Sequence, residues 1–217
     1  MEPQRYRVEP LSHEHLSGVV AVHRVSMPGY FMTNLGPRFL KMYYEEHILS
    51  PLGVGFVAID QADGRVVGVV VGCTDGAAFD RWANRRQLAP KVLLAFGRLF
   101  RSGRLWGQAI SRVRPLVRSL RVKVRRAGNG TEKGGLRRMR SGVRTIAVLP
   151  EARGTGVAAE LMRAFEKAMV ARGITRLGLS TRPDNLGAIR FYEKNGWQRF
   201  KETSEGVYFV RELREGP

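Results

Sequence analysis

The sequence predicts an α+β fold in which a mixed, mostly antiparallel central sheet is flanked by helices. Three observations support this class. Helical patterns and a hairpin come first, a strongly basic stretch follows, and the last third alternates strands with helices. The length of 217 residues and the hydrophobic share of 43% suffice for one core. We therefore expect a single domain over residues 1–217.

The first third of the chain has the patterns of a strand, two helices and a hairpin. Residues 6–11 alternate as a first strand, and residues 13–27 repeat apolar side chains at helical spacing up to a Pro-Gly pair. A second helix, over 37–49, begins with proline, a favoured first helical residue, and ends before Ser-Pro. Residues 55–59 and 66–73 are two strands joined by a turn that contains Asp-Gly, so a hairpin is predicted.

All of the excess positive charge lies in one internal segment. The formal net charge is +18, and residues 81–144 hold 19 of the 37 Lys and Arg but only one of the 19 Asp and Glu. The rest of the chain is electrically balanced. Such a concentration of positive charge is expected to bind anions, which can be phosphates, an acidic protein or an anionic surface.

Residues 77–141 are predicted to form a basic helical insertion with a mobile loop. Helices are predicted over 91–101 and 104–126. In the second, apolar residues from Trp106 to Val124 fall at alternating spacings of four and three, and Pro115 should kink or split it. Residues 127–140 are rich in Gly, Arg and Lys and have little to bury, which predicts the loop.

The last third of the chain has the clearest elements. Its apolar periodicities and glycine stops predict alternating strands and helices that end in an antiparallel pair. In chain order, these are a strand over 143–149, a helix over 155–172 ending at Gly173, a strand over 174–181, a short helix over 185–195 capped by Gly196, and strands over 197–200 and 207–213.

Composition argues against several functions. Cys73 is the single cysteine and lies in an apolar run, so we interpret it as a buried structural thiol. The four histidines lack the spacing of a zinc site, and no metal is expected. The sequence shows no secretory leader and no apolar run long enough to span a membrane, so cytoplasmic residence is expected.

A glycine-rich turn between the strand over 143–149 and the long helix is the main candidate binding motif. Its backbone N–H groups and the positive end of the helix dipole point at one spot, which favours a phosphate. The two glycines permit close approach, and the arginine adds a planar donor. The turn consists of Arg153, Gly154, Thr155, Gly156, Val157 and Ala158.

Two other nucleotide-binding motifs fit this turn less well. It lacks the Lys-Ser/Thr ending of a P-loop. It fits the dinucleotide fingerprint in its spacing of Gly154, Gly156 and Ala159, but four residues separate it from the strand and no acid follows at the ribose position. An ordinary glycine-containing helix start remains an alternative.

Two segments resemble the signature motifs of a known superfamily. TIAVLPEARGTGVA at 145–158, followed by NLGAIRFYEKNGW at 185–197, is similar to the paired motifs of the GNAT superfamily of acyl-CoA N-acyltransferases. The resemblance covers residues 143–200, and the helices and hairpin at 13–73 match the common core, whereas 77–141 does not. It implies a GNAT-like sheet in which the strands 143–149 and 174–181 splay apart.

The resemblance also implies how the acyl donor, acetyl-CoA or another acyl-CoA, is held. The glycine turn would bind the pyrophosphate through backbone amides, and a backbone N–H near Val148 would polarise the thioester oxygen. Asn185 would touch the cofactor arm, and Tyr192 would stand near the thioester sulfur. The strand edge that would pair with pantetheine consists of Ile146, Ala147 and Val148.

Tyr192 is the candidate catalytic acid, because collapse after amine attack expels a thiolate that benefits from a proton. A core tyrosine is the alternative interpretation. No good base is found: the strand over 143–149 has no glutamate, and Glu45, Glu46 and His47 are most simply a solvated helix face. Water would serve instead. Acceptor specificity is assigned to the loop over 28–36, with Tyr30 and Phe31.

The function predicted is transfer of an acetyl or other acyl group from CoA to a primary amine by direct attack in a ternary complex. The acceptor is expected to be small and anionic, such as an amino sugar or nucleotide-linked amine. Alternatives are an acyl-CoA sensor or nucleic-acid-binding module on this fold, or an acyltransferase fed by an acyl carrier protein. For the basic insertion, carrier protein and anionic membrane are further candidate partners, nucleic acid ranks last, and a solvated helical hairpin is the simplest interpretation. Monomer and homodimer both remain open.

Overall fold

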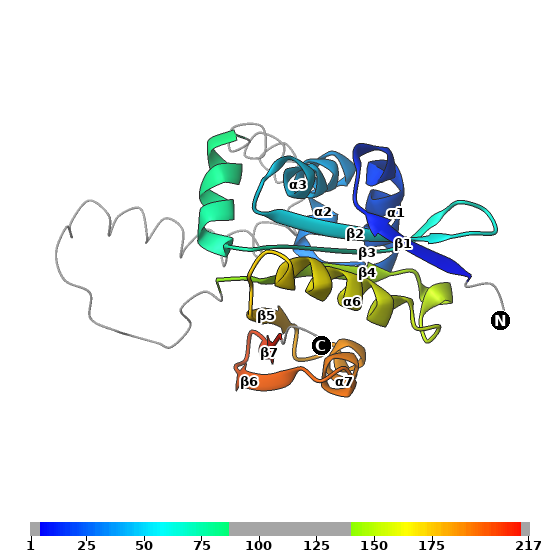
Figure 1. The fold of residues 1–217 in the computed structure, drawn as a ribbon. Coiled ribbons are helices and arrows are strands. Elements are labelled where there is room, and N and C mark those ends of the chain that lie inside the picture. The colour runs from blue at the N-terminus through cyan, green and yellow to red at the C-terminus, as the bar shows by residue number, and fades with distance from the viewer. Residues whose placement is uncertain (1–4, 87–139, 214–217) are drawn as a thin grey trace.

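A computed structural model describes residues 5–86 and 140–213. The helices predicted over 91–101 and 104–126, and nearly all of the predicted loop over 127–140, lie outside the described residues. Within the described part, a helix over residues 76–86, green in Figure 1, follows the last strand of the N-terminal half. The backbone N–H of Gly76 donates to the carbonyl of Arg140 at 2.6 Å, so the two ends of the basic segment are joined at the body of the protein.

Seven strands form one mixed sheet in the order β1-β2-β3-β4-β5-β7-β6. Every neighbouring pair is antiparallel except β4 and β5, which are parallel. This confirms the predicted fold class. The strands are β1 (Tyr6–Pro10), β2 (Gly53–Asp60), β3 (Val66–Cys73), β4 (Gly142–Val148), β5 (Arg176–Thr181), β6 (Gln198–Glu202) and β7 (Val207–Glu212).

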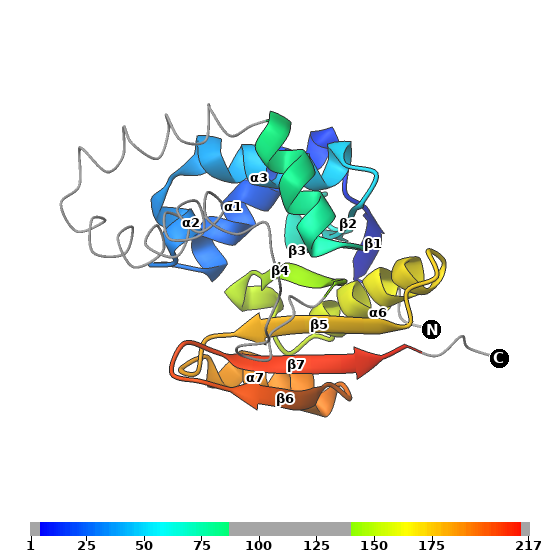
Figure 2. The same cartoon turned by 90° about the vertical axis from the view of Figure 1, so that its left-hand side faces the viewer.

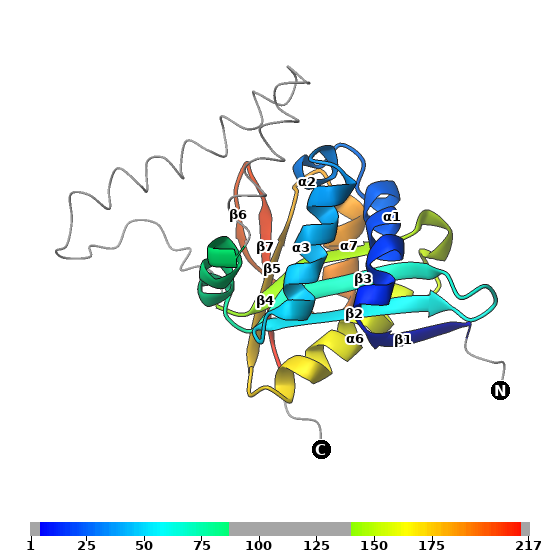
Figure 3. The ribbon, with the colours of Figure 1, turned by 90° about the horizontal axis from the view of Figure 1, so that it is seen from above.

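Helices cover both faces of the β1–β4 part of the sheet. Helices α1 and α3 lie on one face and α6 on the other, as Figures 1 and 3 show. Helix α7 packs beside β6 in the C-terminal part. The helices are α1 (Leu16–Ser26) after a 3-10 turn (His13–His15), α2 (Phe31–Asn34), α3 (Pro37–Leu49), α6 (Val157–Val170) after a 3-10 turn (Pro150–Ala152), and α7 (Leu186–Lys194).

Two predicted boundaries differ from the structure. The segment 28–36, expected to be a loop, contains the one-turn helix α2. The helix expected from residue 155 begins at Val157, because Gly156 has a φ of 91° in the left-handed region and forms the N-cap. The strands and the other helices lie within a few residues of their predicted positions.

Close packing of α6 against β3 fixes the position of the glycine turn. All residues of β3 are buried, and two of them are glycines. A Cβ on Gly68 would lie 2.9 Å from Leu161, and a Cβ on Gly72 would lie 2.6 Å from Phe165. The absence of these side chains lets α6 lie flat against the strand, and its N-terminus therefore lies beside the end of β4.

Strands β4 and β5 touch at one point and then separate, as the resemblance implied. Their ladder contains a single residue pair, Gly142 with Gly178. A Cβ on Gly142 would collide with the carbonyl of Gly178, so glycine is required for this approach. Figure 2 shows β5, β7 and β6 as a group that diverges from β4. The divergence leaves an open edge on β4.

Candidate active site

A cleft of about 1070 Å³ lies where β4 and β5 separate. Its walls come from α1, the segment around α2, β4, the glycine turn, the β5–α7 connection, α7 and the β6–β7 turn. Most of the residues predicted for the site line it: Tyr30, Phe31, Ile146, Ala147, Val148, Arg153, Gly154, Gly156, Ala158, Asn185 and Tyr192. The predicted Thr155 and Val157 are not among the lining residues. Val157 is 1% exposed and packs in the core, and the Thr155 hydroxyl donates to the carbonyl of Ala152 at 2.7 Å.

The backbone of β4 presents free hydrogen-bonding groups to the cleft. The N–H of Leu149 donates to the carbonyl of Val67 at 2.9 Å, so odd-numbered residues at this end of β4 face β3. By alternation, the backbone groups of Ile146 and Val148 face the open edge. The Val148 carbonyl accepts from Ser26 Oγ at 2.9 Å and from Arg153 Nε at 3.2 Å. Its N–H remains available to a ligand.

The glycine turn fits a bound anion. Gly154 and Gly156 have φ values of 80° and 91°, and no atom lies within 4 Å of a Cβ built on either. The first amides of α6 have no carbonyl one turn earlier to accept from them. Arg153 is anchored through Nε, which leaves its two terminal NH₂ groups free for phosphate oxygens. These groups together suit the pyrophosphate of CoA.

Tyr192 is held rigidly at the inner side of the cleft. Its side chain is 5% exposed, and its ring lies 5.5 Å from Phe191, 6.0 Å from Trp197 and 5.4 Å from Phe209 between centroids. Burial raises the pKa of the Tyr192 phenol well above its ordinary value, so the group stays protonated. No described residue hydrogen bonds its hydroxyl. A protonated phenol in contact with a cleft is suited to donate a proton.

Comparison with known proteins gives the family. The model of the Acetyltransferase (GNAT) family matches residues 116–197, which include the glycine turn and Tyr192. The matched residues therefore carry the features of a GNAT acetyltransferase domain, which supports the resemblance to the GNAT superfamily. A domain of this kind indicates an acyl-CoA-dependent N-acetyltransferase.

Solved structures share the fold at low sequence identity. SsHAT is 18% identical over 98% of this chain and 100% of its own, with a TM-score of 0.59. The ribosomal-protein-S18-alanine N-acetyltransferase from Escherichia coli is 11% identical over 98% and 96%, with a TM-score of 0.54. The PaiA N-acetyltransferase from Thermoplasma acidophilum, solved with coenzyme A, is 13% identical over 96% and 99%, with a TM-score of 0.54. At these identities the likeness concerns the fold alone.

Tyr30, which immediately precedes α2, contacts the connection between β5 and α7 beside the cleft. Asn185 Nδ2 donates to Tyr30 Oη at 3.5 Å, and the Arg182 guanidinium lies 5.2 Å from the Tyr30 ring centroid. The Asn185 side chain also caps α7 by accepting from the N–H of Ala188 at 3.1 Å. Asn185 is thus engaged within the protein, and its contact with the cofactor arm stays a prediction. Sequence patterns gave no indication of Arg182.

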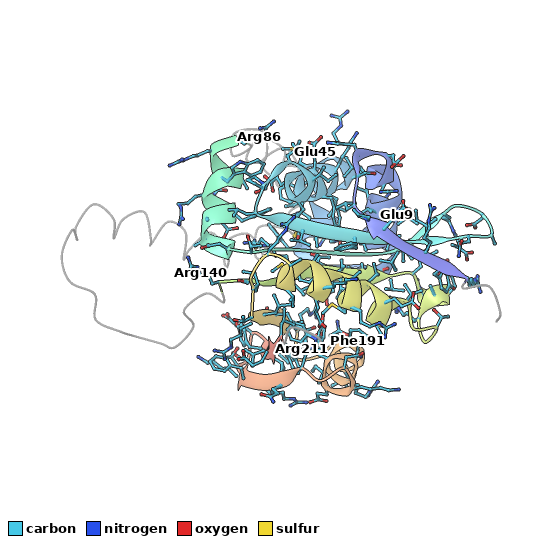
Figure 4. All side chains as sticks on the ribbon, viewed as in Figure 1. Glu9, Glu45, Arg86, Arg140, Phe191 and Arg211 are labelled. Carbon is cyan, nitrogen blue, oxygen red and sulfur yellow. The ribbon has the colours of Figure 1, made fainter. Side chains whose placement is uncertain are left out.

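The three candidate bases on α3 do not line the cleft. Glu45 is paired with His13 at 3.8 Å, and Figure 4 shows it on the opposite side of the strands from Phe191. Glu46 and His47 are only 1% and 3% exposed, so interpreting them as a solvated face was wrong. The helix over 76–86 packs against α3 at His47, where the ring centroids of Phe79 and His47 are 4.7 Å apart.

Among the described residues, no helix is long and apolar enough to cross a membrane, and no group of His, Cys, Asp and Glu is suited to hold a metal ion. The prediction for Cys73 is confirmed, because its side chain is 2% exposed and burial raises the pKa of the thiol. Arg144 Nε donates to its sulfur at 3.3 Å.

A buried histidine that sequence analysis did not assign to the site also lines the cleft. His23 on α1 is 2% exposed, and its Nδ1 lies 2.7 Å from Tyr44 Oη. No described residue hydrogen bonds its Nε2. Burial lowers the pKa of His23 to about 4, so the ring is neutral at pH 7. The only signal in the sequence was its place on the apolar face of the predicted helix.

His23 should make the protein less stable in acid. The unfolded chain binds a proton here below about pH 6.5, whereas the folded chain does so only near pH 4. Stability should therefore fall as the pH drops through this window, by up to about 3 kcal/mol. Urea denaturation of wild type and His23→Asn between pH 4 and 8 measures the effect. The difference in unfolding free energy between wild type and His23→Asn should change below pH 6.5. A difference that stays constant from pH 4 to 8 would contradict the prediction.

Proposed function

We propose that this acetyltransferase moves an acetyl or other acyl group from CoA to the primary amine of a small anionic acceptor, by direct attack in a ternary complex. The observation that carries the proposal is that one cleft joins the open edge of β4, the glycine turn and Tyr192. These three features correspond to the needs of the reaction: an extended site for pantetheine, a site for pyrophosphate and a proton donor.

The acyl donor would lie along β4. The free N–H groups of Ile146 and Val148 are spaced as in a strand and would pair with the amides of the pantetheine arm. The glycine turn would hold the pyrophosphate, and Arg153 would add charge-assisted hydrogen bonds. Bound in this way, the thioester would lie between β4 and α7, close to Tyr192.

The chemistry requires an uncharged amine, a polarised carbonyl and a protonated leaving group. The Val148 N–H would polarise the thioester oxygen as the amine attacks. The C–S bond then breaks, and the Tyr192 hydroxyl would give its proton to the departing thiolate. Because Glu45, Glu46 and His47 do not line the cleft, water would carry away the proton of the amine.

Charge supports an anionic acceptor. The cations that line the cleft are Arg144, Arg153, Arg182 and Lys194, against the acids Asp184 and Glu205. Arg144 is paired with Asp80 at 2.8 Å and Arg182 with Asp184, which leaves Arg153 and Lys194 as the cations without a described acidic partner. The +18 net charge adds a long-range attraction for anions.

The test is release of free CoA from acetyl-CoA in the presence of an amine panel. Amino sugars and nucleotide-linked amines should be acetylated faster than polyamines, which the positive field repels. Binding of acetyl-CoA without CoA release for any amine would favour the alternative, an acyl-CoA sensor. Turnover only with acylated carrier protein would instead identify that protein as the donor.

The positive charge of the basic segment should control salt dependence. We expect the rate with an anionic acceptor to fall with ionic strength, because screening over about 10 Å at 0.1 M suppresses steering. Replacing Arg118, Arg121, Lys123, Arg125 and Arg126 together with glutamine should raise the acceptor KM and flatten its salt dependence. Acetyl-CoA affinity should not change.

The matched control removes five exposed charges from the electrically balanced part of the chain. These are Arg38, Lys41, Arg163, Lys167 and Arg190. This variant should retain most of the salt dependence. If the two variants lose salt dependence equally, the basic segment is a solvated surface. The same conclusion follows if replacing the five charges of the segment changes neither the acceptor kinetics nor binding to carrier protein, vesicles or nucleic acid.

A further inference from the structure

We propose that His23 binds substrate in the cleft by donating a hydrogen bond from Nε2–H to a carbonyl oxygen. The inference rests on the proposed function and adds a residue to the same site. The carbonyl has two possible sources, the acyl thioester and the amine acceptor, and both present the same chemistry to the ring.

The position of His23 along α1 places it beside the reactive part of the cleft. Ser26, three residues later on the same face of the helix, bonds the carbonyl of Val148 at 2.9 Å. A second contact ties the neighbouring helix to the same strand, since Tyr43 Oη lies 2.8 Å from Thr145 Oγ1. His23 therefore lies on a helix that packs against β4, and it lines the same cleft as Ile146 and Val148.

The hydrogen bond to Tyr44 determines which ring nitrogen carries the proton. Tyr44 is fully buried, and among the described residues His23 Nδ1 is the partner of its hydroxyl. If Nδ1 carried the proton, the phenol O–H would have no acceptor and Nε2 would have no donor. If Tyr44 donates to Nδ1, only one group lacks a partner. The second arrangement is favoured because each unpaired buried polar group is destabilising, and it places the proton on Nε2.

The Nε2–H is a donor prepared for an incoming acceptor. It is buried, no described residue accepts from it, and the residue lines the cleft. Because Nδ1 faces Tyr44, the opposite edge of the ring is the one that His23 can present to a ligand. A neutral N–H in apolar surroundings suits a carbonyl oxygen, and binding one would satisfy the group.

Two substitutions separate the cleft contact from the core contact. In His23→Asn, the side-chain oxygen can still accept from Tyr44, but nothing replaces Nε2. In His23→Gln, the amide nitrogen reaches the place of Nε2, but Tyr44 loses its acceptor. We expect kcat/KM to fall at least fivefold in His23→Asn with a near-normal Tm, and to stay within about threefold in His23→Gln with a lowered Tm. If His23 were purely structural, kcat/KM would fall more in His23→Gln, which loses the contact with Tyr44, than in His23→Asn.

Nuclear magnetic resonance of ¹⁵N-histidine-labelled protein identifies the source of the oxygen. The His23 signals are assigned as those absent from His23→Asn. Acetyl-CoA should shift the Nε2 resonance relative to CoA if the thioester is the acceptor of the hydrogen bond. With CoA bound, glycinamide should shift it relative to ethylamine if the amine substrate supplies the carbonyl.

The outcomes separate this inference from the proposed function. The role of His23 alone would be overturned if the protein binds acetyl-CoA tightly, the Nε2 resonance is the same with both members of each pair of probes, and His23→Asn has normal kinetics. Proton occupancy of Nδ1 rather than Nε2 at pH 7 would also overturn it. Failure of the protein to bind acetyl-CoA would overturn the proposed function and this inference with it.

Discussion

Acetyl-CoA affinity should fall about a hundredfold when Gly156 is replaced by alanine. The added methyl group would enter the open space over the first turn of α6, where no protein atom lies within 4 Å. A phosphate that approaches the amides would meet this methyl group. Loss of two hydrogen bonds to a charged oxygen, each of at least about 1.5 kcal/mol, corresponds to this factor. Isothermal titration calorimetry with acetyl-CoA measures it.

Gly173→Ala is the control at the other end of the same helix. Gly173 has a φ of 73°, and no atom lies within 4 Å of its Cβ position, so alanine there introduces a comparable strain of about 1–2 kcal/mol. Both variants should therefore have a lower Tm than wild type, and only Gly156→Ala should bind acetyl-CoA more weakly. Unchanged affinity in Gly156→Ala would remove the glycine turn from the site.

Elements with strong local signals were predicted well. The apolar face of α6 contains Leu161, Phe165 and Met169, which are all fully buried, and its repeat could be read from the sequence without knowledge of its partners. The glycine turn was also predicted from local sequence. Glycine favours left-handed backbone, and the start of a helix has a recognisable pattern.

The cleft itself could not be derived from local patterns. It exists because β4 and β5 separate after the contact of Gly142 with Gly178, and neither glycine differs in sequence context from an ordinary strand glycine. Only the resemblance to the superfamily implied this separation. A contact such as that of Ser26 with Val148, 122 residues apart, likewise has no local signal.

Burial of polar residues was the second feature that the sequence did not show. His23 lies on the apolar face of its predicted helix and Glu46 on a face interpreted as solvated, and both side chains are at least 98% buried. Their environment comes from the packing of α1 and α3 on each other and on the sheet, and from the helix over 76–86 beside α3. Such polar groups are found only once the tertiary packing is known.

Removing the hydroxyl of Tyr192 should abolish most of the turnover while leaving the protein folded. Tyr192→Phe keeps the ring, and with it the contacts to Phe191, Trp197 and Phe209. The hydroxyl has no described hydrogen-bond partner, so its loss leaves no buried group unpaired. A general acid typically contributes about a hundredfold or more, and kcat should fall by that factor. Acetyl-CoA affinity and Tm should stay near their normal values.

Tyr6→Phe is the matched control, since Tyr6 is a buried tyrosine, 6% exposed, on β1 and does not line the cleft. It should leave kcat unchanged. Steady-state rates of CoA release with the best amine of the panel compare the three proteins. Because the raised pKa keeps the Tyr192 phenol protonated, its ionisation should cause no loss of wild-type activity up to about pH 10. If Tyr192→Phe turns over within about threefold of wild type, Tyr192 is a packing residue and the thiolate takes its proton from water.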